Sequence, residues 1–258
     1  MPHQFDVKKY ERFSTHHKGW AKRLSVELSL KGNERILDLG CGDGALTAQL
    51  AALVPKGTVV GIDASRRMIE TARAHQSSNL SFVVRDINDL DDTEAYEVIF
   101  STATLHWVHD HHALIEKVYR ALAPEGALRF NFGGDGNCIH FHKIVREAMA
   151  RPEYAPYFAA FSWPWFMPSV ESYLGFMSEH PFQEARVWGE NAERYFATEE
   201  LLTNWVDQPS LVPFMGGIDP ADRQQFREYV LRRMIEDTRQ PDGRYFETIR
   251  RINVFARK

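Results

Sequence analysis

The chain has 258 residues, of which 44% are hydrophobic and 26% charged, a balance typical of a globular protein long enough to bury a large core. A formal net charge of −4 without a cluster of Lys and Arg argues against nucleic acid as a partner, and a count of two cysteines argues against a disulfide framework. The N-terminus lacks the apolar region of a signal peptide and no run of 18 apolar residues occurs, so we expect a cytoplasmic protein without a membrane partner.

In the first half of the chain, short apolar runs alternate with helical patterns. Ser65 and Asp110 are predicted N-caps, because each precedes a segment with apolar residues at helical spacing. This rhythm of strand and helix predicts a parallel sheet with helices on both faces. The expected strands are 36–39, 59–62, 80–84, 98–101 and 127–132, and the first expected helix is 45–53.

An aromatic region follows the fifth predicted strand, after a flexible break rich in glycine. Nine of the 23 residues from Tyr154 to Phe176 are Phe, Tyr or Trp. We interpret residues 138–181 as a helical cap or lid inserted over the C-terminal edge of the sheet. The whole chain, residues 1–258, is expected to form a single domain around this insertion.

Alternating patterns return in the last third of the chain. The segments around 182–196 and 245–256 predict the last two strands of the sheet. Between them, Asp219-Pro220 predicts the start of a long helix, with Asp as the N-cap and Pro at the first helical position.

A glycine loop after the first predicted strand is the strongest signal in the sequence. It reads Asp38-Leu39-Gly40-Cys41-Gly42-Asp43-Gly44 and lies between a strand and a helix, the context that a ligand-binding glycine loop requires. Glycines allow sharp backbone turns and let a ligand approach where a Cβ atom would otherwise stand. The helix N-terminus that follows favours negative charge nearby.

Two acidic residues occur at the ends of the next two strands. Asp63 follows Gly44 by 19 residues and ends the second strand, where a carboxylate can accept hydrogen bonds from a ribose diol. Asp86 ends the third strand, where a carboxylate can accept from an adenine amino group. Three successive strand ends therefore predict one adenosyl site.

The spacing and charge of the loop distinguish between adenosyl cofactors. Dinucleotide sites usually read G-x-G-x-x-G, so that helix N–H groups can hold a pyrophosphate. Here the spacing is G-x-G-x-G and Asp38 precedes it, which would repel a pyrophosphate but suits a ligand with an ammonium and a sulfonium. The pattern favours S-adenosylmethionine over NAD. A tight turn with two incidental acids is the alternative.

These residues resemble those of class I S-adenosylmethionine-dependent methyltransferases over about residues 34–132. The segment from Asp38 to Gly44 is similar to the first motif of that family, Asp63 to its ribose acid and Asp86-Ile87 to its adenine contact. The resemblance implies an α/β, Rossmann-like fold with a seven-stranded, mostly parallel sheet whose seventh strand is antiparallel. It also implies S-adenosylmethionine as cofactor and S-adenosylhomocysteine as product. The residues expected to bind the cofactor are Tyr10, Asp38, Gly40, Cys41, Gly42, Gly44, Asp63, Ala64, Met68, Asp86, Ile87 and Thr102.

Two members of that set have a second interpretation. Tyr10 lies in the N-terminal segment, which in related methyltransferases closes over the cofactor, but Phe13 and Trp20 also fit an amphipathic helix docked on the fold. Met68 packs either at the adenine edge or in the core.

The segment after the fourth predicted strand faces the transferred methyl group in this fold. Its Leu105-His106-Trp107 triplet resembles juvenile hormone acid O-methyltransferases and trans-aconitate methyltransferases, which methylate carboxylates of small molecules. The resemblance implies a small, partly apolar carboxylic acid as acceptor, with His106 and Trp107 as candidate catalytic residues. His106 either hydrogen-bonds the acceptor, acts as a base for a hydroxyl, or packs beside the cofactor. Trp107 either faces the sulfonium, walls the substrate pocket, or packs in the core.

A carboxylate acceptor agrees with the lack of an obvious acid–base constellation in the sequence. Its pKa is near ~4, so it is ionised at neutral pH and needs only alignment and the exclusion of water. Acceptors at carbon, nitrogen or a hydroxyl, or a carrier-bound malonyl group, remain alternatives. So do an NAD-linked oxidoreductase and a non-catalytic S-adenosylmethionine-binding module, and the pattern favours no oligomeric state.

Two further groups of polar residues invite functional interpretations. Arg146 and Arg151, at the base of the aromatic insertion, are either clamps for a substrate carboxylate or ordinary surface residues. His109, His111 and His112 surround a predicted helix start without the Cys, Asp or Glu spacing of a metal site, so no metal is expected.

Overall fold

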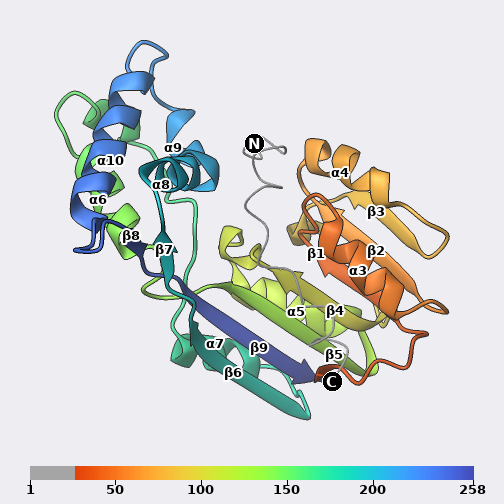
Figure 1. The fold of residues 1–258 in the computed structure, drawn as a ribbon. Helices are drawn as coiled ribbons and strands as arrows, with labels where there is room; N and C mark the ends of the chain where they lie inside the picture. The colour runs from red at the N-terminus through yellow and green to blue at the C-terminus, as the bar shows by residue number, and fades with distance from the viewer. Residues whose placement is uncertain (1–26) are drawn as a thin grey trace.

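The computed structural model describes residues 27–258, which form a seven-stranded sheet with helices on both faces and a cap beside one end of the sheet (Figure 1). The strand order is β3-β2-β1-β4-β5-β9-β6, and β9 is antiparallel to both β5 and β6. The predicted fold class is therefore confirmed. The strands of the sheet are β1 (Arg35–Leu39), β2 (Thr58–Asp63), β3 (Leu80–Val84), β4 (Tyr96–Thr102), β5 (Leu122–Gly133), β6 (Glu184–Asn191) and β9 (Arg250–Arg257).

Successive residues of the central strands face opposite sides of the sheet and are buried on both. Leu37 packs with α5 (His111–Ala121) and α7 (Val170–Ser178), whereas its neighbour Ile36 packs with α3 (Ala45–Leu53) and α4 (Arg66–Ala72). Parallel strands covered by helices on both faces require such continuous apolar runs. The two layers hold the carboxyl ends of β1 to β4 in a fixed arrangement.

Polar caps begin the helices around the sheet, as the sequence predicts. Ser65 accepts a hydrogen bond from the N–H of Met68 at the start of α4, and Asp110 accepts from the N–H of Ala113 at the start of α5. Each bond satisfies a backbone donor that the first turn leaves free. Both N-cap predictions are confirmed.

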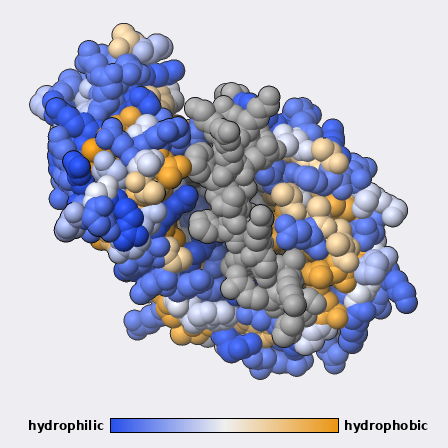
Figure 2. All heavy atoms as spheres, viewed as in Figure 1, coloured by the Kyte–Doolittle hydropathy of each residue, from blue (hydrophilic) through white to orange (hydrophobic). Residues whose placement is uncertain are grey.

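The cap consists of two segments, residues 138–168 and 192–249, that lie on either side of β6 in the sequence. They share a hydrophobic core that is separate from the two clusters of the sheet, and the outer face of the cap visible in Figure 2 is largely hydrophilic. Its elements are α6 (Ile139–Met149), η5 (Ala155–Phe158), β7 (Arg194–Phe196), α8 (Glu199–Trp205), η6 (Val206–Ser210), α9 (Val212–Met215), α10 (Arg223–Thr238) and β8 (Tyr245–Glu247).

These bounds differ from the insertion expected at 138–181. Tyr173 and Met177 of α7 join the core of the sheet, because α7 packs against α5 and β6. The second cap segment lies after β6, so half of the unit is separated in sequence from the aromatic stretch that signalled it. The high content of aromatic residues does not show which of them pack in the core of the sheet and which in the core of the cap.

The long helix of the cap begins three residues later than expected. The carbonyl of Asp219 accepts from the N–H groups of Asp222 and Arg223, and its carboxylate accepts from that of Ala221. Asp219-Pro220 therefore forms a turn that leads into α10, and Asp222 holds the N-cap position. The predicted start at Asp219 is wrong, because an Asx turn uses the same residue types as an N-cap.

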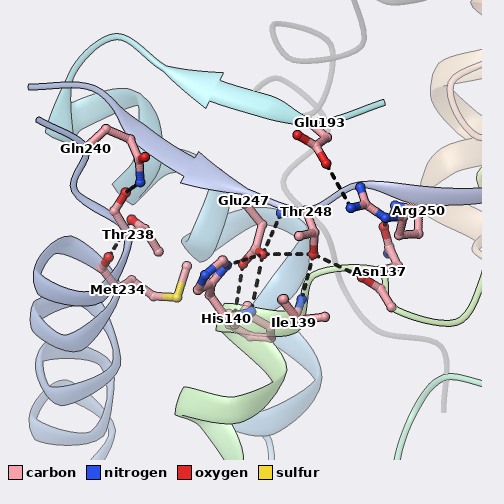
Figure 3. Close-up of polar contacts among 12 residues, drawn as sticks. Asn137, Ile139, His140, Glu193, Met234, Thr238, Gln240, Glu247, Thr248 and Arg250 are labelled. Atoms are coloured by element: carbon pink, nitrogen blue, oxygen red, sulfur yellow. Dashed lines mark hydrogen bonds and ion pairs between the residues drawn. The ribbon is translucent and has the colours of Figure 1, made fainter. Parts of the chain in front are cut away.

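A buried carboxylate joins the two segments of the cap (Figure 3). Glu247 has an exposed fraction of 0% and accepts from the N–H of Phe141 at 2.9 Å, that of His140 at 3.3 Å and the His140 ring at 2.9 Å. Thr248 accepts from the N–H of Ile139 at 3.1 Å and donates to Gly136 O at 3.0 Å. The first turn of α6 is therefore satisfied by Glu247, the last residue of β8, and by Thr248, which follows it.

Within residues 27–258, no helix is both long enough and apolar enough to cross a membrane.

Candidate active site

The glycine loop connects the end of β1 to the start of α3. The N–H groups of Gly40 and Cys41 both donate to the carbonyl of Ile62, at 2.8 and 2.9 Å, which ties the loop to the end of β2. The side chain of Cys41 is buried in the core with Leu46, where burial raises its pKa. Cys41 therefore contributes only its backbone to the ligand-binding side of the loop.

The three glycines of the loop all have positive φ, at 73°, 56° and 80° for Gly40, Gly42 and Gly44. They differ in what a side chain would meet. A Cβ on Gly40 would lie 2.1 Å from Thr104 Cγ2, and one on Gly44 would lie 2.7 Å from Phe82 Cζ, whereas one on Gly42 would meet no atom of residues 27–258 within 4 Å. Gly40 and Gly44 are thus required for packing, and Gly42 faces the open space that a ligand would need.

Asp38 is a buried carboxylate at the end of β1. Thr47 Oγ1, in the first turn of α3, donates to its Oδ2 at 2.7 Å. Burial raises the pKa of Asp38 to about 7, the hydrogen bond from Thr47 opposes this, and the charge of Asp63 adds to it. A cationic ligand would stabilise the ionised form of this carboxylate.

Asp63, at the end of β2, lies opposite the glycine loop. Its Oδ2 accepts from the N–H of Gly42 at 3.1 Å and its Oδ1 from that of Ser65 at 2.8 Å. Burial raises the pKa of Asp63, and these two hydrogen bonds oppose the shift. Each oxygen retains a lone pair, so the carboxylate can accept both hydroxyls of a vicinal diol.

Asp86 lies beyond the end of β3 and is exposed. Its Oδ1 accepts from the N–H and the side-chain amide of Asn88, at 2.8 and 2.9 Å, at the start of η3 (Ile87–Asp89). The charge of Asp86 also raises the pKa of Asp63, so the two carboxylates are neighbours. The structure therefore brings Asp38, Asp63 and Asp86 together across β1, β2 and β3, which are adjacent in the sheet.

The remaining residues of the predicted cofactor set lie around these acids. Ala64 is exposed beside Asp63, whereas Met68 and Ile87 are buried in the turns that follow. Thr102 is half-buried at the end of β4. Tyr10 lies outside the described residues, so its predicted contact stays a prediction.

The segment after β4 contacts the glycine loop directly. Thr104 Oγ1 lies 3.0 Å from Gly40 O and 3.1 Å from Thr102 O, and can donate to either. Thr104 precedes η4 (Leu105–Trp107), which carries both predicted catalytic residues. The roles of Thr104 and Thr47 were not predicted, although each contacts a residue of the glycine motif. The available signal for Thr47 was a polar residue in the helix that follows the loop.

His106 presents an unpaired nitrogen at this point. Its Nδ1 is buried and has no hydrogen-bond partner in the described part of the chain. Burial lowers the pKa of His106 to about 3, and the charge of Arg251 contributes, so the ring is neutral at physiological pH. The carbonyl of His106 accepts from the N–H of Phe166 at 2.8 Å, which fastens residues 159–168 of the cap, here called the strap, to the end of β4.

Trp107 lies between the sheet and the cap. Its ring centroid is 5.7 Å from that of His106 and 5.5 Å from that of Trp165 in the strap, the latter in an edge-on arrangement. It also packs against the core of the cap. The structure therefore gives Trp107 a packing role at the wall between the two units.

A pocket of about 230 Å³ adjoins this wall within the cap. Its lining combines aromatic, cationic and polar groups from α6, the strap and the turn after β5: Asp135, Gly136, Asn137, His142, Arg146, Trp163, Trp165 and Met167. Arg151, by contrast, lies outside the lining and pairs with Glu153 at 2.6 Å.

The predicted histidine cluster has a structural explanation. His111 is buried and bonds to Tyr173 OH at 3.3 Å and to Leu105 O at 3.1 Å, whereas His109 and His112 are exposed. In residues 27–258, no group of three His, Cys, Asp or Glu side chains is arranged to hold a metal ion.

Polar residues on β5 were also missed by the sequence analysis. Asn131 Oδ1 accepts from Arg251 Nε, and Asn131 Nδ2 donates to Asn253 Oδ1 at 2.8 Å. The charge of Arg251 adds to the effect of burial in lowering the pKa of His106. Arg129 and Asn131 are buried and alternate with apolar residues of β5, and that alternation was the signal that could have revealed these polar residues.

Comparison with known proteins assigns the class that this fold and site define. The Methyltransferase domain family matches residues 30–147. Trans-aconitate 2-methyltransferase from Methylobacterium radiotolerans is 30% identical over 96% of this chain and 96% of its own. The chain belongs to the class I S-adenosylmethionine-dependent methyltransferases and is an enzyme with S-adenosylmethionine as its cofactor.

Two further comparisons give a second relative and a structure of the same fold. Malonyl-[acyl-carrier protein] O-methyltransferase from Priestia megaterium is 30% identical over 76% of this chain and 74% of its own. The solved structure of the YcgJ protein from Bacillus subtilis superposes with a TM-score of 0.65 at 15% identity, covering 94% of this chain and 98% of that one. Membership of the family excludes the oxidoreductase alternative.

Proposed function

We propose that this enzyme transfers the methyl group of S-adenosylmethionine to a carboxylate oxygen of a small carboxylic acid. One observation carries the proposal: His106, in η4 after β4, has a buried Nδ1 without a hydrogen-bond partner among residues 27–258, and burial lowers its pKa to about 3. The ring is therefore neutral and a weak base.

A weak base at this position favours one class of acceptor. An alcohol must lose its proton to become a good nucleophile, and an imidazole whose conjugate acid has a pKa of about 3 gives little help. A carboxylate is ionised already at neutral pH and needs no base. The neutral His106 ring can instead donate its N–H to the acceptor oxygen that is not methylated, which fixes the orientation of the carboxylate.

The residues at the strand ends fit the cofactor by their chemistry. Asp38 offers a buried negative charge to an ammonium group, Asp63 accepts from the ribose diol, and the space beside Gly42 admits the ligand. Bound S-adenosylmethionine supplies a methyl group on a sulfonium, and its transfer to a carboxylate oxygen forms the O–C bond as the C–S bond breaks, neutralising both charges. Trp107 and the strap exclude water from this step, which favours the less polar transition state.

The names of the relatives support the same chemistry. Trans-aconitate is a small carboxylic acid, and the malonyl group of a carrier protein also ends in a free carboxylate. The formal net charge of −4 gives no reason to expect a basic docking surface for an acidic carrier protein, so a free small acid is the preferred acceptor.

The test is a set of acceptors that differ only in the reacting group. Purified enzyme is incubated with labelled S-adenosylmethionine and trans-aconitate, a panel of unsaturated and aliphatic acids, and the alcohols and amines of matching carbon skeleton. We expect label in the acids alone, released as methanol by mild alkali because it is held as an ester. Alkali-stable label in the alcohols or amines would contradict the proposal.

A further inference from the structure

Arg146 occupies an unusual position among the arginines of the cap. It lies one helical turn after His142 on α6, so both side chains face the strap. Its guanidinium lies over the ring of Trp163, 4.1 Å from the centroid. Among residues 27–258, no carboxylate lies within ion-pair distance of Arg146, whereas Arg151 in the next turn pairs with Glu153.

The positive charge of the pocket comes from the guanidinium of Arg146. His142 stacks on Trp165 with centroids 5.3 Å apart, and burial lowers its pKa to about 4, with the charge of Arg146 contributing. His142 is therefore neutral at physiological pH. Of the side chains that line the pocket, Arg146 carries the positive charge, and the one carboxylate, Asp135, is exposed to solvent at the turn after β5.

The pocket is next to the proposed site of methyl transfer. Trp165 lines it and also meets Trp107 edge-on, and the neighbouring Phe166 donates to the carbonyl of His106. His142 lies close enough to His106 to contribute to its lowered pKa. The ring of Trp165, which His142 stacks on and Trp107 meets edge-on, thus connects the end of β4 to the pocket.

We propose that Arg146 determines acceptor specificity by binding a second carboxylate of the acceptor, the one that is not methylated. This inference rests on the proposed function. The planar guanidinium can hold a carboxylate through two parallel hydrogen bonds, and the ring of Trp163 keeps the fork in one plane. Lysine would supply the charge without that geometry.

The experiment compares two six-carbon unsaturated acids: trans-aconitate, with three carboxylates, and trans-2-hexenoate, with one. Wild type, Arg146→Gln, Arg146→Lys and the control Arg151→Gln are assayed for kcat and KM. Calorimetry on the enzyme loaded with S-adenosylhomocysteine gives the Kd of each acid without turnover. Circular dichroism confirms that each variant is folded.

We expect Arg146→Gln to raise the Kd and KM of trans-aconitate by about 10- to 100-fold, as for a lost charge-assisted pair, and to leave those of trans-2-hexenoate unchanged. Arg146→Lys falls between wild type and Arg146→Gln, and Arg151→Gln matches wild type. Equal effects on the two acids, or no effect of Arg146→Gln on the binding of trans-aconitate, would overturn the inference.

The two proposals fail in different ways. If trans-aconitate binds through Arg146 but neither acid is methylated, the proposed carboxylate chemistry fails and the anion site stands. If both acids are methylated with the same KM in wild type and Arg146→Gln, the chemistry stands and the role of Arg146 fails.

Discussion

The cofactor side of the sheet and the cap are built on different rules. On the sheet, Asp38, Asp63 and Asp86 belong to strands that are adjacent in space, so a repeated pattern of strand, turn and acid in the sequence becomes one site. In the cap, the pocket residues come from α6, the strap and the turn after β5, and they share their core with a second segment beyond β6. The cofactor site can therefore be predicted from short sequence motifs, whereas the acceptor pocket depends on tertiary contacts.

The comparison is tested most severely at Gly42. We expect Gly42→Val to weaken S-adenosylmethionine binding by about 100-fold or more, since the side chain would occupy the space beside the loop and its φ of 56° disfavours a branched residue. Calorimetry measures the loss. Gly175→Val, at an exposed position of α7 where a Cβ meets nothing within 4 Å, is the matched control and should bind normally. Normal binding by Gly42→Val would remove the loop from the site.

The junction between the two segments of the cap is tested at Glu247. Replacing this buried carboxylate with Ala leaves the N–H groups of His140 and Phe141 without their acceptor, and we expect a loss of about 3 kcal/mol in the free energy of unfolding. Denaturant titration measures it. Glu171→Ala, an exposed acid in the first turn of α7, should cost less than about 0.5 kcal/mol. Equal effects of the two variants would show that the junction does not depend on this carboxylate.

The acids at the strand ends should contribute unequally. We expect Asp63→Ala to weaken cofactor binding by about 1–3 kcal/mol, because a half-buried group would lose its partner. Asp86→Ala should have a smaller effect, since Asp86 is exposed and water can replace it. The Kd values of the two folded variants decide the matter, and an unchanged Kd for Asp63→Ala would contradict its ribose role.

The smallest expected effect is a pH dependence that comes from Asp38. Its pKa of about 7 means that it gains a proton as the pH falls below 7, so the affinity for the cationic cofactor should fall by up to about tenfold per pH unit. Because the folded state holds this proton more tightly than the unfolded state, stability without cofactor should decrease as the pH rises from about 4 to 7. Asp38→Asn should abolish both trends, and their persistence would point to another group.

The sequence was sufficient for the parts of the molecule where neighbouring residues decide the outcome. The helix predicted at 45–53 and the strand at 80–84 match α3 and β3 residue for residue, because glycines and apolar runs mark their ends. The side chains that support the site were not predictable: Thr104 reaches Gly40 across 64 residues, and Arg251 reaches Asn131 across 120. Such pairs depend on strand order, which no local pattern encodes.

The same difference explains the errors in the cap. Asp219-Pro220 has the composition of a helix start, but its carboxylate forms a turn before α10 begins. The aromatic stretch that ends at Phe176 contributes to two separate cores, so its density could not show that α7 belongs to the sheet.

The hydrogen bonds between Glu247 and the first turn of α6 have a consequence for how acceptor preference can change. Since this turn is anchored to Glu247 at the end of β8, three residues before β9 begins, the helix that carries His142 and Arg146 is tied to the segment that leads into the sheet. The distance between the methyl donor and the far wall of the pocket is therefore fixed by the fold. Only the side chains of that wall can vary. New acids can be accommodated by substitutions on one face of α6 and in the strap, without a change at the adjacent site of methyl transfer.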